Sequence, residues 1–451
     1  MTPARKAAPS ASLYRAIWRW HFYAGLFVVP FILLLALTGA IYLFKPQLDA
    51  WQERDWRNLP VAGAVTPDAQ LKAALAAVPG ATFHSYRLPE AAGDAAVIHV
   101  GLAEGGMRDI AVSPQGKVIA IDDPEARIAA TVSRIHGSLL LGQWGGLLVE
   151  IAASWAILLI LSGLYLWWPR GRGLAGVLWP RLGARGRIVW RDLHAVTGFW
   201  VSGLALVLLV SGLPWTDGWA TAFRAVRAEL GLVQGPQQWK GGVDLHAEHD
   251  HEAMLRAAKR GTPVPMGMTL TDMVARAQAE GVPAPAILSP PGAPAQFGPP
   301  NGNIWKLTSA TQNRPIARTV QFDPMTGDVV ARSGFADKHP IDRAIGYGIA
   351  WHEGQLFGWI NQLIGVLTAL ALMLLAVSGV AMWWRRRPDG SLGAPPRPAD
   401  AKLRGVAAIT LVMAALLPML ALSLIVVFVF DRLILPRVPR AARWLNRTRP
   451  A

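Results

Sequence analysis

The chain contains no cysteine. This absence excludes disulfide bridges, iron–sulfur clusters held by cysteine and haem attached through thioether bonds. Charge is also scarce, since charged residues make up 16% of the 451 residues and hydrophobic residues 52%. A soluble protein of this length carries more charge. The composition therefore favours a membrane protein, and any redox cofactor in it must be held by ligands other than cysteine.

The apolar residues are concentrated in runs of at least the roughly 20 residues that a helix needs to cross a bilayer. These runs are approximately Gly25–Phe44, Leu147–Trp168, Ala195–Trp215, Trp359–Trp384 and Val406–Phe430. The first run is long and uninterrupted and lacks a cleavage pattern, so we expect an uncleaved anchor. The pattern predicts an α-helical polytopic membrane protein embedded in the lipid bilayer.

The chain has a net charge of +15, and many of its basic residues lie in a few loops. Arginine and lysine cluster before the first run, between the second and third, and between the fourth and fifth. Loops rich in these residues stay on the cytoplasmic side of a membrane. The N-terminus is therefore predicted inside and the two large polar stretches, about 46–135 and 216–350, outside. This placement argues against nucleic acid as the partner of the positive charge.

The C-terminus does not fit five simple crossings. These would place a cluster of arginines outside, namely Arg432, Arg437, Arg440, Arg443, Arg447 and Arg449. Two explanations stay open. Either the last run re-enters the membrane with Pro418 as its kink, or the C-terminus breaks the positive-inside rule.

The first four apolar runs share one pattern: a histidine near the start and a pair of small residues near the end. The pairs are Thr38-Gly39, Ser162-Gly163, Ser211-Gly212 and Ser378-Gly379, and the histidines are His21, His136, His194 and His352. From each histidine to its hydroxyl residue there are 17, 26, 17 and 26 positions. The spacing predicts that the first two helices are duplicated as the next two, in parallel orientation.

The predicted topology sorts these histidines by depth. His21 and His194 lie at cytoplasmic helix ends, and His136 and His352 lie at external ends. Two axial histidines from facing helices make an electron-transfer haem site. The sequence therefore predicts two non-covalent haem b groups, with these four histidines as axial ligands of the haem iron. The alternative is four interfacial side chains without a ligand, which the duplicated spacing disfavours.

Other residues near the histidines have two explanations each. The small pairs leave room for a flat macrocycle, or they let helices pack closely. Four arginines near the histidines are candidate partners of haem propionates: Arg19, Arg134, Arg191 and Arg343. For Arg19 and Arg191, cytoplasmic topology is an alternative explanation. These are cofactor-binding candidates, and the sequence does not identify catalytic residues.

Two further features are polar. Glu150 falls in the outer turns of the second helix, where it relays protons, meets a positive partner or lies among the lipid headgroups. His246, His249 and His251 form a dense cluster in the second polar stretch. Histidine-rich tracts bind metals, but without the spacing of a known site an exposed polar loop is the preferred interpretation.

In both polar stretches, the pattern of apolar and polar residues is typical of small α/β domains. The first is predicted to contain one helix and four strands, at Asp68–Ala77, Thr82–Leu88, Ala95–Gly101, Arg108–Val112 and Lys117–Ile121. The second is predicted to contain a helix, a strand and a hairpin turn, at Thr271–Glu280, Ile304–Thr308 and Asp323–Gly327. Ala284–Asn303 is rich in proline and glycine and is predicted to be a loop.

With these features the chain resembles the PepSY-associated transmembrane family over nearly its whole length. The resemblance rests on the histidine-led helices, the serine–glycine pairs, the Trp167-Trp168-Pro169-Arg170 exit of the second helix and the small external domains, which look like PepSY modules. The family includes iron-regulated proteins of the bacterial inner membrane, among them reductases of ferric siderophores that hold b-type haems. The resemblance thus implies haem and iron.

The predicted fold is a four-helix haem-binding core of two duplicated two-helix units, plus a fifth helix and two small α/β PepSY-like periplasmic domains. The predicted segments follow the chain in the order 1–24 (cytoplasmic), 25–44 (first span), 45–135 (first periplasmic domain), 136–168 (second span with a periplasmic extension), 169–193 (cytoplasmic), 194–215 (third span), 216–351 (second periplasmic domain), 352–384 (fourth span with a periplasmic extension), 385–404 (cytoplasmic), 405–430 (fifth span) and 431–451 (basic tail).

Three functions compete. In the leading one, electrons from a cytoplasmic or quinol donor enter at the His21/His194 haem, pass to the His136/His352 haem and reduce a ferric siderophore or other ferric chelate in the periplasm. Reduction weakens the hold of a hard oxygen chelator on iron, so iron is released for uptake. In the second, the PepSY-like modules sense a ligand or restrain a protease without redox activity. The third is a transporter built on the same repeat.

Overall fold

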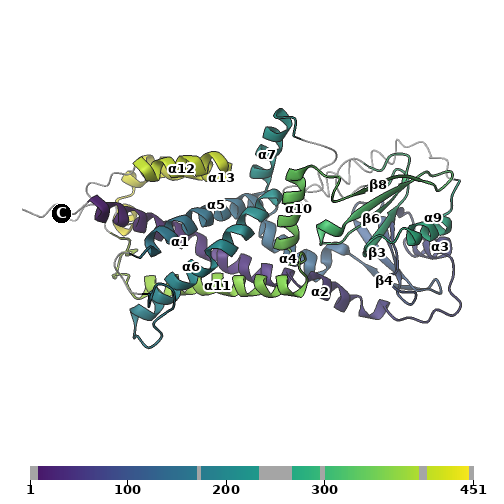
Figure 1. The fold of residues 1–451 in the computed structure, drawn as a ribbon, viewed down its shortest axis with the longest axis horizontal. Helices are drawn as coiled ribbons and strands as arrows, with labels where there is room; N and C mark the ends of the chain where they lie inside the picture. The colour runs from purple at the N-terminus through teal and green to yellow at the C-terminus, as the bar shows by residue number, and fades with distance from the viewer. Residues whose placement is uncertain (1–8, 170–173, 233–266, 295–299, 396–403, 446–451) are drawn as a thin grey trace, which may run out of the picture. The chain divides into compact units, whose positions relative to one another are not determined.

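The computed structural model describes residues 9–169, 174–232, 267–294, 300–395 and 404–445 (Figure 1). The chain folds into two compact units, each assembled from separate segments. Unit 1 comprises Met1–Ala40, His136–Val226 and Leu363–Ala451, and unit 2 comprises Ile41–Ile135 and Arg227–Gln362. Unit 1 holds most of the long apolar helices, and unit 2 holds the β-sheet.

The long helices are apolar and largely uncovered by protein. Within the described residues, the helices long and apolar enough to cross a membrane are Ser12–Tyr42, Gly142–Trp167, Arg187–Trp215, Trp359–Trp384 and Pro418–Arg437. Leu37 and Val210 are each more than half exposed. Such wide exposure of large apolar side chains marks a surface that is covered by lipid. The prediction of a polytopic helical membrane protein is confirmed.

The helical elements of this part are α1 (Pro9–Tyr42), α4 (Ile128–Ser138), α5 (Gly142–Trp167), α6 (Arg187–Gly212), η3 (Leu213–Trp215), α7 (Asp217–Glu229), α11 (Trp359–Trp384), α12 (Arg404–Leu416), α13 (Pro418–Val429), the π-helical turn η5 (Phe430–Ile434), η6 (Leu435–Arg437) and α14 (Pro439–Trp444). Four of them, α1, α5, α6 and α11, run alongside one another (Figure 1).

Contacts between these four helices close a ring. Helix α1 meets α5 where Gly25 approaches Leu159, and α5 packs along α6. Helix α6 meets α11 where Gly198 lies 3.4 Å from the Leu375 side chain, measured from an added Cβ. The chain just after α11 returns to α1, since the Arg386 guanidinium lies over the Trp18 ring. Helices α1 and α6 are therefore diagonal partners across a four-helix arrangement.

The last helices form a hairpin and not a single span. Leu417 leaves helical geometry, with φ −128° and ψ 89°, because the residue before a proline is disfavoured in the helical region. Helix α13 then begins beside the end of α6, where Leu420 is fully buried with Leu213 and Ile157. The Trp155 indole donates to the Ser423 hydroxyl at 3.0 Å.

The chain beyond the hairpin comes back to the end of unit 1 that carries His21. The Tyr23 hydroxyl donates to the Leu445 carbonyl at 2.5 Å, and the Leu392 N–H donates to the Trp444 carbonyl at 3.0 Å. Leu392 belongs to the basic connector that precedes the hairpin. Of the two explanations for the C-terminus, the structure therefore supports re-entry with a break at Pro418. The span predicted at 405–430 is divided, and the candidate span is Pro418–Arg437.

We predict that the N-terminal, connector and C-terminal regions all lie on one side of the membrane. Because the chain has no cysteine, single cysteines report sidedness without background. Asp389→Cys and Arg440→Cys should react with a membrane-impermeant maleimide from the same side. Ala64→Cys, which follows one crossing, should react from the opposite side. Labelling of Arg440→Cys together with Ala64→Cys would contradict the hairpin.

Unit 2 joins the two polar stretches into one antiparallel sheet. The first stretch supplies β1 (Thr82–Arg87), β2 (Ala96–Gly101), β3 (Met107–Val112) and β4 (Val118–Asp122), and the second supplies β5 (Ala286–Ser289), β6 (Trp305–Ser309), β7 (Arg318–Phe322) and β8 (Val329–Gly334). Among the described residues the strand order is β4-β3-β2-β1-β5-β6-β7-β8. The two halves meet where Tyr86 pairs with Leu288 and Arg87 with Ile287. The two predicted modules thus share a single sheet.

The predicted loop at Ala284–Asn303 is wrong for part of its length. Its first residues form β5, which pairs with β1 on one side and β6 on the other. Pro285 and Pro290 stand just outside the strand, so neither removes a donor from the ladder. Pairing with β1 and β6 makes these four residues a strand. The sequence did not predict it, because so short a segment has little periodicity of its own.

The helices that cover the sheet begin at clear caps. In α3 (Pro67–Ala77) the Thr66 side chain accepts from the Ala69 N–H, and Pro67 occupies the first turn. Helix α9 (Leu270–Ala279) begins with a capping box between Thr269 and Asp272. The remaining elements of the unit are α2 (Lys45–Gln52), η1 (Arg54–Trp56), η2 (Pro124–Ala126), η4 (Arg314–Ile316) and α10 (Pro340–His352).

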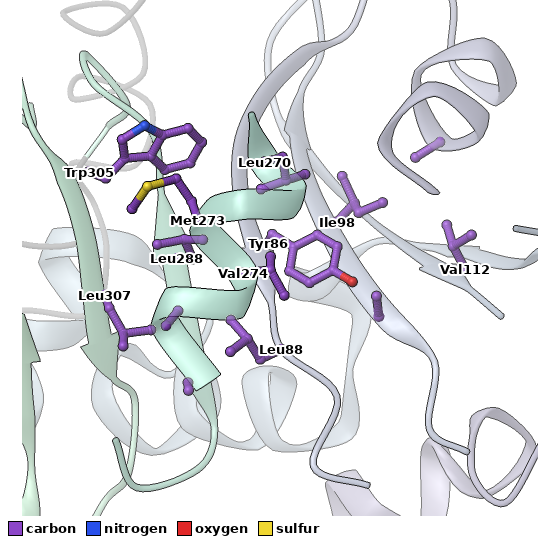
Figure 2. Close-up of a cluster of buried hydrophobic side chains, with 14 of the residues drawn as sticks. Tyr86, Leu88, Ile98, Val112, Leu270, Met273, Val274, Leu288, Trp305 and Leu307 are labelled. Carbon is purple, nitrogen blue, oxygen red and sulfur yellow. The ribbon is translucent and has the colours of Figure 1, made fainter. Parts of the chain in front are cut away.

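One hydrophobic core serves both halves of the sheet (Figure 2). Met273 of α9 is fully buried beside Leu288 and Trp305, while Tyr86 and Ile98 come from the first half. Full burial of one such side chain stabilises a fold by about 1.5–3 kcal/mol. The halves therefore stabilise each other through shared burial as well as through the β1–β5 pairing.

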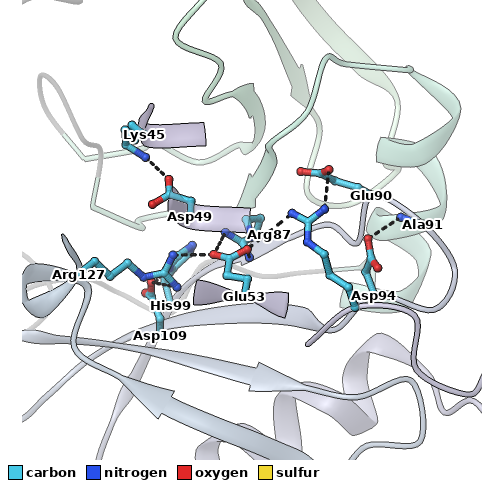
Figure 3. Close-up of polar contacts among 11 residues, drawn as sticks. Lys45, Asp49, Glu53, Arg87, Glu90, Ala91, Asp94, His99, Asp109 and Arg127 are labelled. Carbon is cyan, nitrogen blue, oxygen red and sulfur yellow. Dashed lines mark hydrogen bonds and ion pairs between the residues drawn. The ribbon is translucent and has the colours of Figure 1, made fainter. Parts of the chain in front are cut away.

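A buried ion network ties the sheet to the chain that enters it (Figure 3). Glu53, just after α2, accepts from Arg87 at 3.0 and 2.8 Å and from Arg127 at 2.5 Å. Asp109 of β3 contacts the His99 imidazole and lies 3.7 Å from Arg127. Burial alone raises the pKa of Glu53, but the guanidinium groups of Arg87 and Arg127 reverse this and hold it below its ordinary value.

Replacing Glu53 by Gln should loosen the first half of the sheet, because Arg87 and Arg127, both partly buried, then lose the charge of the carboxylate that binds them. Removing one partner of a buried pair costs about 3–5 kcal/mol. Amide hydrogen exchange in β1–β3 should accelerate on the order of 100-fold at pH 7. Since the folded pKa lies below the ordinary value of about 4.3, the wild-type advantage should persist at pH 5 and decline below about 4.

The matched control for this variant is Glu90→Gln. Glu90 also pairs with an arginine, Arg57, but is 43% exposed, and exposed pairs contribute about 1 kcal/mol or less. Equal exchange rates in the two variants would show that the buried network does not stabilise the sheet.

Candidate cofactor-binding site

The structure brings together two of the four predicted ligand histidines. His21 lies on α1 and His194 on α6, the diagonal helices of the ring described above. Their ring centres are 6.4 Å apart and their planes are nearly perpendicular, at 87°. Metal–imidazole bonds measure about 2 Å, which places the centres of two imidazoles on one metal about 6 Å apart. The observed separation matches this arrangement.

The Nδ1 atom of His194 carries the ring proton. It lies 3.0 Å from the Leu375 carbonyl oxygen and 3.2 Å from the Ser378 hydroxyl. A carbonyl oxygen only accepts, so Nδ1 donates. In the neutral imidazole the other nitrogen, Nε2, then keeps its lone pair, which is the form that binds a metal.

His21 has the same tautomer for a related reason. Its Nδ1 lies 2.9 Å from the Ser162 hydroxyl oxygen. The Ser162 hydroxyl already donates to the Leu159 carbonyl of its own helix at 3.1 Å. With its proton directed at that carbonyl, the hydroxyl oxygen accepts from the imidazole, and the ring proton is again on Nδ1.

His136 repeats this geometry at the other end of α1. It lies on α4, a separate short helix, because the chain breaks at Leu139 and Leu140, which have φ of 55° and 58°, before α5 begins. Its Nδ1 is 3.0 Å from the Thr38 hydroxyl oxygen. Thr38 donates to the Leu34 carbonyl at 2.7 Å, so His136 also donates through Nδ1.

In three of the four small pairs, the glycine makes space for the ring that the hydroxyl residue binds. A Cβ added at Gly39 would lie 3.2 Å from Cε1 of His136, and one added at Gly163 would lie 3.3 Å from Cε1 of His21. At Gly379 the corresponding distance to His194 is 3.5 Å. The small pairs thus receive histidine rings, a role that is distinct from both explanations offered by the sequence.

His352 lies in unit 2, as the last residue of α10. Glu353 follows it and is buried, which raises the pKa of its carboxyl. The chain then turns through Gly354 and Gly358, at φ of 73° and 59°, before α11 begins at Trp359. His136 and His352 belong to different units, so their pairing stays a prediction of the sequence.

The four predicted propionate-binding arginines have varied surroundings. Arg19 donates to the Pro395 carbonyl and lies 5.1 Å from the centre of the Tyr23 ring. Arg191 donates to the buried carboxylate of Asp192 at 2.6 Å, and Arg181 binds the same carboxylate. Arg134 of α4 pairs with Glu125 at 3.5 Å. Arg343 lies within α10, partly buried.

One arginine near His21 was assigned only a topological role from the sequence. The Arg386 guanidinium is 4.9 Å from the Trp18 ring centre and 5.4 Å from that of Phe22. Burial, and then the positive charge of Arg187, lowers its pKa. No feature of the local sequence distinguishes Arg386 from its basic neighbours, because the contact is made across two helices.

Glu150 has a structural partner. Its carboxylate is buried and accepts from the backbone N–H groups of Gly218 and Trp219 at 2.9 and 2.8 Å. These groups belong to the first turn of α7, where the helix dipole is positive. Glu150 thus caps α7, which corresponds to the positive partner among its predicted roles.

Within the described residues, no group of three or more histidine, cysteine, aspartate or glutamate side chains could hold a metal ion. His246, His249 and His251 lie outside the described residues. A haem iron takes only two axial protein ligands, and two neutral imidazoles with Nε2 unprotonated are the appropriate donors. The His21/His194 pair therefore fits a non-covalent haem.

Comparison with known proteins identifies the chain over most of its length. The family model described as PepSY-associated TM region matches residues 18–386. No curated protein matches the chain. The matched range includes all four histidines and all four small pairs discussed above.

Proposed function

Because the chain belongs to the PepSY-associated TM family, we propose that it is a di-haem b oxidoreductase that passes electrons across the bacterial inner membrane to a ferric chelate in the periplasm. The observation that carries the proposal is the approach of His21 and His194 to 6.4 Å between ring centres. Two partly buried histidines whose rings lie this close in apolar helices, both with Nε2 available, have few other uses in a membrane.

The protein's own residues hold and orient the cofactor. His21 and His194 would hold the inner haem iron from diagonal helices, so binding would tie α1 to α6. The second haem rests on the duplicated spacing of 26 positions from His136 to Ser162 and from His352 to Ser378. When bound, haem supplies one-electron redox chemistry. Arginines at the helix ends, Arg386 among them, are candidate partners for the propionates.

The direction of transfer follows from the charge distribution. Basic connectors face the cytoplasm, which puts His21 and His194 on the side of a cytoplasmic or quinol donor. His136 and His352 then lie on the periplasmic side, and each electron delivered there converts one Fe(III) to Fe(II). Ferrous iron is a softer cation than ferric iron and is held less tightly by oxygen chelators, so the siderophore releases it for uptake.

A second candidate function is favoured by the sheet. Unit 2 forms one continuous eight-stranded antiparallel sheet among its described residues, a large platform for a ligand or a protein partner. A PepSY-type sensor or protease regulator without redox activity would use this platform alone. The visible absorption spectrum of the purified protein separates the two functions.

Purified protein from haem-replete cells should carry two b-type haems per chain. Pyridine haemochrome analysis should give about two equivalents with the spectrum of unmodified protohaem, since no cysteine is present to form thioethers. Dithionite should reduce both. A colourless protein would refute the proposal and favour the sensor.

The two haems should be removable one at a time, because 17 helical positions span about 25 Å and one macrocycle cannot bridge the two depths. His194→Ala should halve the haem content and leave one site's spectrum intact. His352→Ala should remove the other haem, with the inner haem still reducible by the donor while ferric-chelate reduction fails.

The matched control for these variants is His99→Gln, a histidine that contacts Asp109 in the sheet. It should retain both haems. If His21→Ala and His352→Ala removed the same haem, pairing by membrane depth would be wrong.

A further inference from the structure

The hydroxyl residues of the small pairs have a fixed hydrogen-bonding direction. Thr38, Ser162 and Ser378 each donate to a carbonyl three or four residues earlier in their own helix, at 2.7, 3.1 and 3.0 Å. Serine and threonine within apolar helices commonly make this bond. With the hydroxyl proton used in this way, each hydroxyl oxygen is available to the neighbouring helix as an acceptor.

Each acceptor meets the Nδ1–H of one histidine on a different helix. Thr38 accepts from His136, Ser162 from His21 and Ser378 from His194. The glycine that follows each hydroxyl residue lies against Cε1 of the same ring. Two adjacent residues thus fix both the tautomer and the position of the imidazole.

We infer that Thr38, Ser162 and Ser378 are positioning residues that hold the histidines with Nε2 directed to the metal and that set the reduction potential of the bound haem. This inference rests on the proposed function. A hydrogen bond from Nδ1–H makes Nε2 a stronger donor and favours the ferric state. Loss of the acceptor should therefore make the haem easier to reduce.

The two histidines of the inner pair differ in a way that provides an internal comparison. His194 has two acceptors, the Leu375 carbonyl at 3.0 Å and the Ser378 hydroxyl at 3.2 Å. For His21 the acceptor is the Ser162 hydroxyl at 2.9 Å. Removing Ser378 leaves a backbone acceptor in place, whereas removing Ser162 takes away the hydroxyl on which His21 depends. Removing the Ser162 hydroxyl should therefore change the properties of this haem more than removing the Ser378 hydroxyl.

The test compares the holoprotein variants Ser162→Ala, Ser378→Ala and Ser162→Thr by haem content, potentiometric titration and electron paramagnetic resonance of the ferric haems. Ser162→Ala should shift the ferric/ferrous equilibrium of one haem about tenfold towards ferrous, or about 59 mV for a one-electron couple, with altered g values. Ser378→Ala should shift the same haem less. Ser162→Thr should restore wild-type behaviour, because it keeps the hydroxyl.

A second pair of variants tests the glycine. Gly163→Ala should displace the His21 ring and change the g values of the same haem or release it. Gly203→Ala is the matched control, because Gly203 lies within α6 and an added Cβ there meets nothing within 4 Å. It should behave as wild type.

The outcomes separate the two proposals. Wild-type protein without haem would overturn the proposed function, and this inference with it. Wild-type protein with two haems, in which Ser162→Ala leaves potentials and g values unchanged, would overturn the inference alone. Loss of haem from Ser162→Ala with retention in Ser162→Thr would support it. Loss from both would overturn it, because side-chain volume and not the hydrogen bond would then be decisive.

Discussion

A polar group within the hydrocarbon layer must find its hydrogen-bond partner inside the protein, because lipid supplies none. The histidine-bearing helices of this chain depend on that constraint. Thr38, Ser162 and Ser378 supply acceptors for three imidazole Nδ1–H groups, and the glycine beside each lets the ring approach. Satisfying one nitrogen in this way leaves the other nitrogen of each ring as a donor for a metal.

The same constraint accounts for the acidic groups at the helix ends. Glu150 is buried but bound to two backbone N–H groups of α7. Asp192, two positions before His194, is fully buried between Arg181 and Arg191. Glu150 thus joins α5 to α7, and Asp192 joins the preceding connector to α6, the helix that carries His194.

In unit 2 the burial of apolar side chains, and not the pairing of polar groups in lipid, holds the elements together. Its two sequence segments share one sheet and one core, and within the unit Glu53 binds Arg87 of β1 and Arg127. Glu53 follows α2, which leads out of α1, and Arg127 immediately precedes α4, which carries His136.

The sequence by itself determined the membrane class and the positions of the long apolar helices. The length of an apolar run can be read from the local sequence, and bilayer thickness decides whether such a run is long enough to span. The positions of basic loops can be read in the same way, and they predict the topology. The strands β1 to β4, with their regular alternation and turns, were predicted to within one or two residues. The tertiary structure alone decided that Ala286–Ser289 is a strand, that the C-terminal helices turn back, and that three of the four small pairs receive imidazole rings. These features depend on partners far away in the chain, such as Ser162 for His21, 141 positions apart, and Ser378 for His194, 184 positions apart. Local sequence encodes period and length, whereas such partners are selected only when the helices and strands pack.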